Sequence, residues 1–229
     1  MTAAASLARV DLFAELTPDE LEGLSARLRR RRYAKATVLF TEGDPGTGLY
    51  VVESGRVRIV LASPAGKELV LAVRGPGEFF GDMALLDGEP RSADAVVAED
   101  CQLLLLRRED FLRFVETHPR AALRLLAVLS RRLRQTMRQH QDATLLDVSA
   151  RLASALLRLA DEQGAPAGDG TGGMVVPITL TQAGLAAQIG VTRESVNKWL
   201  RYFQRRGWIR WEPGRLALLQ PAKLRERLA

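Results

Sequence analysis

The sequence predicts an α+β protein built from an N-terminal β-roll of the jelly-roll type, a long helix, and a C-terminal domain of helices and short strands. Short aliphatic runs separated by glycine-rich turns fill residues 35–106, which is typical of antiparallel strands in a roll or barrel. After residue 107 the apolar residues recur every three or four positions, which indicates helices. A basic segment near residue 190 then matches two short helices joined by a tight turn.

The composition limits the function. The chain has 229 residues and a formal net charge of +6, and it is long enough for two domains with separate cores. No apolar run reaches the ~20 residues that a membrane helix needs. Residues 1–10 lack the features of a secretory signal, so we expect a cytoplasmic protein. The single cysteine, Cys101, cannot form an internal disulfide, and with only His118 and His140 beside it we expect no metal, haem or iron–sulfur site.

The N-terminal part is predicted to begin with a short helix and to continue as strands. Thr17 can cap the helix, because a proline and two acidic residues follow it in the first turn. From Lys35 onward, β-branched and aliphatic runs alternate with turns that contain glycine. The expected strands are residues 37–40, 49–52, 57–61, 69–73 and 101–106, and the turns include residues 43–46, 53–55, 63–66 and 75–77.

A long helix is predicted over residues 108–143. Two interpretations fit its apolar stripe: the helix pairs with its own copy in a coiled coil, or it packs on the roll as an ordinary amphipathic helix. Polar Thr136 and His140 favour pairing, because a polar residue in such a stripe can set the register of two helices. The stripe consists of Leu126, Leu129, Leu133, Thr136, His140 and Ala143.

These patterns divide the chain into the roll at residues 1–107, the long helix at 108–143 and the C-terminal domain at 144–229. A second helix is expected at residues 145–162. The glycine-rich segment 164–173 is expected to be a loop within the C-terminal domain, because it has no residues that could form a core.

Residues 182–200 meet the steric requirements of a helix-turn-helix. Gly190 stands where the turn needs a left-handed residue, and Thr192 can cap the second helix. Residues 208–219 follow as strand, turn and strand, which completes a winged domain with Trp208 and Trp211 in its core. The small shared core of the two helices is predicted to contain Leu185, Ala186, Ile189, Val191, Val196 and Trp199.

The second helix of this motif carries residues suited to DNA. In a helix-turn-helix its N-terminal half enters the major groove. Arg193 can form a bidentate pair with guanine, Glu194 can accept from the cytosine amino group, and Lys198 can reach a guanine or a phosphate. The alternative is that these are solvated charges of a small helical domain. The predicted DNA-binding residues are Gln182, Thr192, Arg193, Glu194, Ser195, Asn197, Lys198 and Arg201.

Residues 79–93, FFGDMALLDGEPRSA, are predicted to hold an anion. Small Gly81 precedes a short helical turn, and Arg91 and Ser92 follow, so that backbone N–H groups, a hydroxyl and a guanidinium can converge on phosphate oxygens. Asp82 can only accept hydrogen bonds when it is ionised, which makes sense beside an anion if the ligand also has hydroxyl groups.

The roll, FFGDMALLDGEPRSA, the striped helix, LLDVSARLASALL and the helix-turn-helix occur in one order along almost the whole chain. Together they resemble the cyclic AMP receptor protein and fumarate-nitrate regulator (Crp/Fnr) superfamily. The resemblance implies a cyclic-nucleotide-binding roll, a dimerising helix and a winged domain that binds double-stranded promoter DNA. It also implies contact with RNA polymerase and a change in the pose of the DNA domains when ligand binds.

The resemblance assigns roles to individual residues. Gly81, Arg91 and Ser92 match the family's phosphate binders, and Asp82 stands where the receptor has a glutamate that takes the ribose hydroxyl. Thr136 matches a threonine that reaches adenine, whereas Met137 replaces a serine from the partner subunit. Lys198 replaces an arginine of the recognition helix. The predicted ligand-binding residues are Gly81, Asp82, Met83, Ala84, Arg91, Ser92, Ala93, Thr136 and Met137.

One main hypothesis and two alternatives follow. The main one is a homodimeric transcription regulator on a pseudo-palindromic promoter site with TGTGA-like half-sites, controlled by a cyclic nucleotide such as cyclic AMP. Asp82 and Met137 motivate the first alternative, a regulator that needs no ligand and is controlled by its own abundance. The second is an enzyme with a regulatory cyclic-nucleotide domain, although the sequence has no nucleophile–base set or Walker-type loop.

Overall fold

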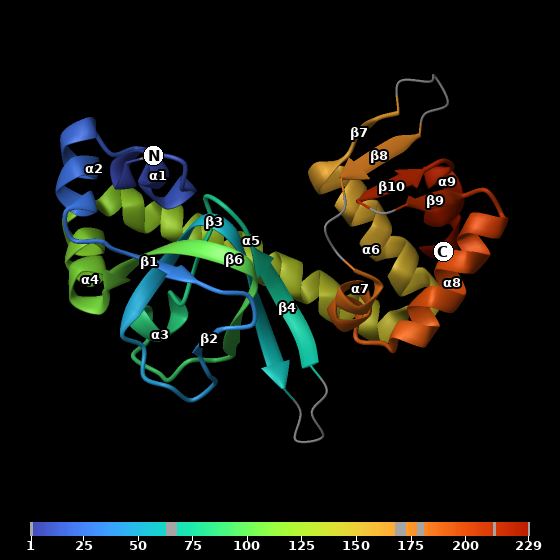
Figure 1. Ribbon diagram of the computed structural model, residues 1–229, viewed down its shortest axis with the longest axis horizontal. Helices are drawn as coiled ribbons and strands as arrows, with labels where there is room; N and C mark the ends of the chain where they lie inside the picture. Colours follow the sequence, from blue (N-terminus) through green and yellow to red (C-terminus); the bar gives the residue numbers. More distant parts are fainter. Residues whose placement is uncertain (1, 63–67, 168–172, 178–180, 213, 229) are drawn as a thin grey trace. The chain divides into compact units, whose positions relative to one another are not determined.

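The computed structural model describes residues 2–62, 68–167, 173–177, 181–212 and 214–228. The chain forms two compact units, Met1–Arg132 and Leu133–Ala229, which are described separately. Figure 1 shows the helices and strands of each unit. The turn expected at residues 63–66 lies outside the described residues, as do residues 168–172 of the glycine-rich segment.

The first unit opens with α1 (Ala3–Leu7), η1 (Asp11–Phe13) and α2 (Pro18–Ser25). The predicted cap of α2 is confirmed: Thr17 Oγ1 accepts from the N–H of Glu20 at 3.3 Å. In return, the Glu20 carboxylate accepts from the N–H of Thr17 at 2.7 Å. This reciprocal pair satisfies two N–H groups that the first turn of a helix leaves without partners.

The strands of the first unit form one antiparallel sheet in the order β1-β6-β3-β4. Short β2 pairs with β6, and short β5 pairs with β3. The helical turn α3 (Met83–Leu86) lies in the connection between β5 and β6. The strands are β1 (Arg29–Tyr33), β2 (Val38–Phe40), β3 (Gly48–Ala62), β4 (Glu68–Arg74), β5 (Phe79–Phe80) and β6 (Asp94–Arg107).

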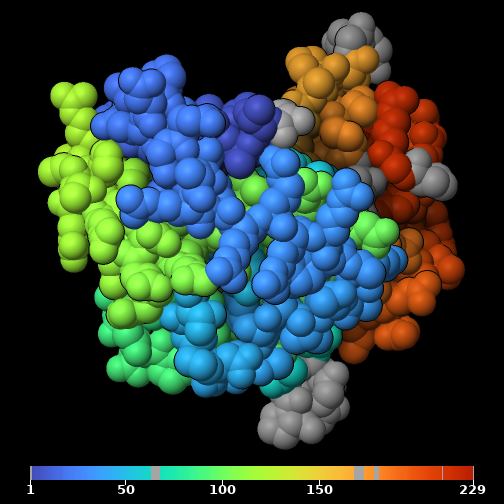
Figure 2. Space-filling view, turned by 60° about the vertical axis from the view of Figure 1, so that its left-hand side comes forward, coloured from blue at the N-terminus to red at the C-terminus, as the bar shows by residue number. Residues whose placement is uncertain are grey.

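Strand β1 is not predicted by the sequence, in which the first β-branched and aliphatic run follows Lys35. Four consecutive arginines, residues 29–32, show no alternation of apolar and polar residues, and all four are exposed. As an edge strand, β1 instead takes its register from backbone pairing with apolar β6. Arg30 also anchors it, since Nη2 donates to the Glu53 carboxylate on β3 at 2.6 Å. Figure 2 shows this part of the chain, in blue, on the surface.

The two strands expected at residues 49–52 and 57–61 are one long bent strand, β3, so the turn predicted at residues 53–55 is wrong. The pairing of β3 with β6 shifts register between Val52 and Val57. Gly55 adopts the left-handed backbone conformation there, with φ +79°. Gly55 therefore allows a β-bulge that bends β3, and the chain does not turn back at this point.

The helix expected over residues 108–143 is divided into α4 (Arg108–Thr117) and α5 (Pro119–Leu145). The break falls at His118, whose backbone is non-helical, with φ −127° and ψ 80°. Pro119 explains the break, because a proline disfavours the helical conformation of the residue before it and can itself begin a new helix.

Helix α5 has two apolar stripes. Ala121, Leu125 and Val128 are buried in the core of the first unit. The predicted stripe is on another side of the helix: Leu126 and Leu133 are 59% and 61% exposed. Leu129 is partly buried, and Thr136, His140 and Ala143 are exposed. The helix therefore packs on the roll through one side, as the second interpretation predicted. Pairing of the exposed stripe with a second copy stays a prediction.

The second unit has a helical core and a four-stranded sheet in the order β7-β8-β10-β9. The segment expected as a loop contains β7 (Ala165–Pro166), which pairs with β8 (Met174–Pro177). The helices begin where predicted or within three residues of it. They are α6 (Val148–Gln163), α7 (Gln182–Ile189) and α8 (Arg193–Arg205), followed by β9 (Ile209–Glu212), β10 (Arg215–Leu218), α9 (Pro221–Arg225) and η2 (Glu226–Leu228).

Replacing Gly55 by alanine tests the bend in β3. A Cβ at this position would lie 2.3 Å from the Asp100 carbonyl oxygen, and the left-handed backbone adds further strain. We expect a loss of about 3 kcal/mol or more in the free energy of unfolding, measured by urea denaturation followed by circular dichroism. Gly43→Ala is the matched control: φ is +89° but no atom lies within 4 Å, so we expect about 1 kcal/mol. Equal losses for the two variants would contradict this account of the bend.

Candidate ligand site and nucleic-acid interface

Arg91 lies in the connection that leads into β6, and its side chain is turned into the first unit. The residue is 4% exposed. Nη1 donates to the carbonyl oxygen of Gly81 at 2.6 Å, and Nη2 donates to that of Gly48 at 2.8 Å. The guanidinium carbon lies 4.2 Å from the ring centroid of Phe40. Two carbonyls and an aromatic face therefore hold the guanidinium in one orientation.

The predicted phosphate role of Arg91 fits its surroundings. Its buried Nε has no hydrogen-bond partner among the described residues. Burial lowers the pKa of Arg91, and nearby Tyr50, Asp44 and Asp82 partly oppose this effect. A buried N–H without a partner is unfavourable, and arginine has five N–H donors of which the two carbonyls use only part. Phosphate oxygens could accept from the remaining donors and compensate for the lost hydration of the cation.

Gly81 is required beside this arginine for steric reasons. A Cβ at residue 81 would lie 2.6 Å from Nη1 of Arg91. Ala84 and Ala93 are buried, whereas Met83 and Ser92 are exposed. The Ser92 hydroxyl lies 3.8 Å from the sulfur of Met83. The structure thus brings Gly81 to the Arg91 guanidinium and Met83 to the Ser92 hydroxyl.

Asp82 has a partner that the sequence analysis missed. The carboxylate is 2% exposed, and Nη1 of Arg132 lies 2.9 Å from each of its oxygens. Nη2 of Arg132 donates to the Phe79 carbonyl at 2.6 Å, and the guanidinium carbon lies 4.6 Å from the Phe79 ring centroid. Arg132 therefore ties α5 to the connection after β5. Nothing in the sequence separates Arg132 from the other arginines of this helix.

A third arginine lies near this pair. Arg74 contacts Glu78, with Nη1 3.0 Å from Oε1, and its buried Nε has no partner among the described residues. Burial lowers the pKa of Arg74, and the charge of Arg132 lowers it further, whereas Glu78 and Asp82 act in the opposite direction. Asp82 is thus paired directly with Arg132, and the charges of Arg74 and Arg91 also interact with it.

Thr136 and Met137 lie on α5 in the second unit. Both are exposed, Met137 by 62%. Their predicted contact with a ligand stays a prediction.

The predicted helix-turn-helix is formed by α7 and α8. Gly190 ends α7 in the left-handed conformation, with φ +69°, and Thr192 Oγ1 accepts from the N–H of Ser195 at 3.2 Å. The predicted core positions 185, 186, 189 and 196 are buried, and Val191 and Trp199 pack against them. Both signals that defined the motif are therefore confirmed.

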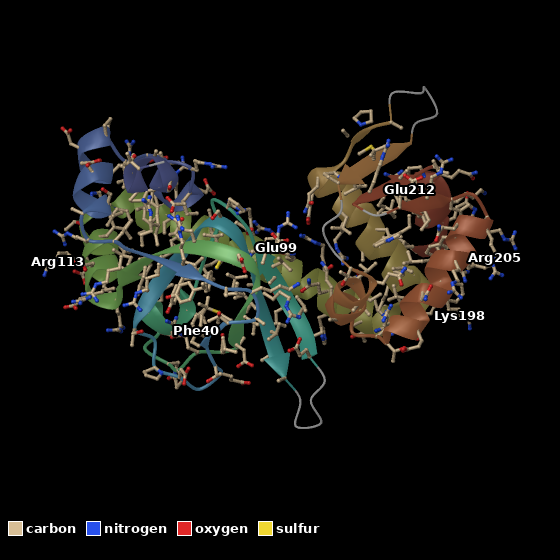
Figure 3. All side chains as sticks on the ribbon, viewed as in Figure 1. Phe40, Glu99, Arg113, Lys198, Arg205 and Glu212 are labelled. Carbon is tan, nitrogen blue, oxygen red and sulfur yellow. The ribbon has the colours of Figure 1, made fainter. Side chains whose placement is uncertain are left out.

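The predicted DNA-binding residues lie on the outer side of this motif. Figure 3 shows Lys198 and Arg205 projecting away from the body of the unit. Gln182, Ser195 and Asn197 are partly exposed, and the exposed positions are Thr192, Arg193, Glu194, Lys198 and Arg201. A concentration of cations on one exposed helix face is what a phosphate backbone requires.

Comparison with known protein families agrees with the description of both the roll and the helix-turn-helix domain. Residues 30–118 match the cyclic nucleotide-binding domain family, and residues 150–227 match the Crp-like helix-turn-helix domain family. The chain belongs to the Crp/Fnr family of transcription regulators.

Named relatives cover almost the whole chain. A CRP-like cAMP-activated global transcriptional regulator of Mycobacterium tuberculosis is 35% identical over 97% of this chain and 96% of its own length. The cyclic AMP receptor protein of Thermus thermophilus is 37% identical over 94% of this chain and 95% of its own. A solved structure of the c-di-GMP-responsive regulator CLP of Xanthomonas campestris has a TM-score of 0.73 at 28% identity, with 88% of this chain and 99% of that one covered.

This Crp/Fnr protein is accordingly a DNA-binding regulator with a cyclic-nucleotide-binding fold. Within the described residues no helix is long and apolar enough to cross a membrane. The same part of the chain contains no cluster of three or more histidine, cysteine or acidic residues that could hold a metal ion. Cys101 is buried, and burial raises the pKa of its thiol.

A double-mutant cycle tests the Asp82–Arg132 pair. Arg132→Met should lower the free energy of unfolding by about 3 kcal/mol, because it leaves a buried carboxylate without its cation. Asp82→Asn in the same chain should restore part of this loss, giving a coupling energy of about 2 kcal/mol in urea unfolding. Strictly additive effects of the two substitutions would show that the contact contributes nothing.

Proposed function

We propose that this Crp/Fnr regulator acts as a homodimer on a pseudo-palindromic promoter site and that a cyclic nucleotide, with cyclic AMP as the first candidate, controls its DNA affinity. The observation that carries the ligand proposal is the buried Arg91 guanidinium, whose Nε lacks an acceptor among the described residues. A cyclic phosphate carries one negative charge, and its oxygens accept hydrogen bonds. It can therefore supply the acceptor that Nε of Arg91 lacks and an anion to pair with the guanidinium.

The neighbouring groups suit the rest of a nucleotide. Asp82 already accepts from Arg132, but an ionised carboxylate has about four lone-pair positions and can also accept from a ribose hydroxyl. Ser92 is exposed beside Arg91 and can donate to the phosphate. Thr136 is proposed to contact the base, with Met137 of the partner subunit beside it, as the resemblance implies.

The apolar stripe of α5 supports the dimer. Two leucines of this stripe, Leu126 and Leu133, are 59% and 61% exposed in the single chain, and Leu123, Met137 and Leu145 of the same helix are 62–71% exposed. Such exposure is unusual for five large apolar side chains on one helix. A second copy of α5 would remove them from water and would gain roughly 25 cal/mol for each Å² of apolar surface. A two-fold dimer would also present two copies of α8 to half-sites about 34 Å apart on one face of the DNA.

The mechanism we propose is a shift between two populations. Arg132 and Asp82 connect the anion site to α5, and α5 continues toward the helix-turn-helix unit. A ligand that contacts Arg91 and Asp82 more favourably in one arrangement of the α5 pair raises the population of that arrangement. The favoured arrangement would place both copies of α8 for successive major grooves of a TGTGA-like palindrome, where bound regulator can contact RNA polymerase.

One alternative has a specific observation in its favour. Both oxygens of Asp82 already accept from Nη1 of Arg132 in this chain, and Met137 cannot donate a strong hydrogen bond to a base. A regulator that binds DNA without ligand and is controlled by its abundance would need neither Asp82 nor Met137 to contact a nucleotide. It is distinguished by unchanged DNA affinity at saturating cyclic AMP.

Calorimetric titration of the purified protein with cyclic AMP, and with cyclic GMP as a second probe, tests the ligand site. We expect Arg91→Ala to weaken cyclic AMP binding at least tenfold, since a charge-assisted bond to phosphate contributes about 1.5–3 kcal/mol. Arg113→Ala, an exposed arginine on α4, is the matched control and should bind as the wild type does. Undiminished binding by Arg91→Ala would show that the anion site is elsewhere.

Replacement of Arg193 by alanine tests base reading by α8. The expected loss is about 1–3 kcal/mol on a TGTGA-type palindrome, with relaxed choice at one base pair of each half-site. Fluorescence anisotropy on a set of single-base variants of the palindrome measures both effects. An equal loss on random DNA would show that Arg193 contacts only phosphate.

A further inference from the structure

The chain continues past the wing into a segment that the helix-turn-helix pattern does not include. Helix α9 and the turn η2 pack on α6, and Leu224 of α9 is completely buried in the core of the second unit. Figure 1 shows α9 and α8 in the same unit, and Arg227 of η2 lies near Trp199 of α8. The end of the chain is thus anchored close to the helix that carries the predicted base-reading residues.

Arg227 makes the contact with that helix. Its guanidinium carbon lies 5.5 Å from the ring centroid of Trp199, and Nζ of Lys198 lies 5.9 Å from the same centroid. Trp199 is partly buried, and its ring meets Tyr202 edge to face at 5.4 Å. Packing against Tyr202 holds the Trp199 ring in place. The cation–π contact with this ring then holds the Arg227 guanidinium beside α8.

Arg227 is also near the start of α6. Asp147 caps this helix: its Oδ1 accepts from the N–H of Ala150 and from the hydroxyl of Ser149, each at 2.8 Å. These hydrogen bonds lower the pKa of Asp147, and the positive charge of Arg227 lowers it further. The guanidinium of Arg227 therefore contacts Trp199 of α8, and its charge acts on the carboxylate that caps α6.

The donors of Arg227 are available to a ligand outside the protein. Arg227 is exposed, and among the described residues no carboxylate or carbonyl accepts a hydrogen bond from it. Lys223 on the same segment is different, because Nζ contacts both oxygens of the Glu226 carboxylate at 2.9–3.0 Å. An arginine held by an aromatic ring, with its planar fork unused, is a common way to bind phosphate.

We propose that Arg227 binds a phosphate of the DNA backbone beside the bases that α8 reads. The partner is DNA phosphate because Arg227 and Lys198 share one tryptophan ring, and Lys198 belongs to the face that enters the groove. This contact positions the protein on the duplex and carries no base preference. The proposal rests on the proposed DNA binding by α8.

The test measures DNA affinity against salt concentration for the full-length protein, with a TGTGA-type palindrome and a scrambled duplex. Arg227→Ala should weaken binding about 3- to 10-fold on both duplexes and reduce the slope of log K against log salt by about 1 per subunit. Arg227→Lys should keep the slope, because it keeps the charge. Arg225→Ala is the matched control: it removes an exposed arginine from the same segment and should leave slope and affinity unchanged.

Two results would overturn the proposal. If Arg227→Ala binds more weakly with an unchanged salt slope, Arg227 only supports Trp199 within the fold. If Arg225→Ala changes the slope as much as Arg227→Ala, the effect is one of overall charge. Thermal unfolding followed by circular dichroism confirms that each variant is folded. Failure of the wild type to bind either duplex would instead reject the DNA binding on which the proposal rests.

Discussion

The first unit depends on the buried guanidinium of Arg91, a residue that is only 4% exposed. Taking an arginine out of water is costly unless acceptors replace the lost hydration. At Arg91 the fold supplies the carbonyl oxygens of Gly48 and Gly81 and the face of Phe40, and it leaves Nε without an acceptor. The connections before β3 and after β5 are held together by this one side chain. The same arrangement leaves a donor that the anion we propose at this site would use.

A second arginine links that site to the helix. Arg132 on α5 contacts the buried Asp82 carboxylate and the Phe79 carbonyl. These residues flank Gly81, whose carbonyl accepts from Arg91. Near the N-terminus of α5, Arg124 contacts Asp11 and Glu15 at 3.0 Å and 2.7 Å. Residues 124–132 of α5 are therefore held to the rest of the first unit at both ends. A ligand that changes the contacts of Asp82 acts directly on the helix that bears the exposed leucines.

Elements set by local chemistry could be predicted from the sequence. Thr17 and Thr192 are helix caps in the sequence and in the structure, and Gly190 has the left-handed backbone that the turn required. What could not be predicted depends on contacts between distant residues. The strand at Arg29–Tyr33 exists because β6 offers an unpaired edge, and Arg132 differs from its neighbours only because the fold places Asp82 beside it. The contact of Arg227 with Trp199 likewise arises from the return of α9 to α6.

The central claim is that an anion at Arg91 changes how the protein binds DNA. The most direct measurement is the affinity of the wild-type protein for a TGTGA-type palindrome, by fluorescence anisotropy at fixed salt, with and without saturating cyclic AMP. The account predicts at least fivefold tighter binding with the nucleotide, which corresponds to a coupling free energy of about 1 kcal/mol or more. The same affinity in both conditions, with cyclic AMP shown to be bound, would contradict it.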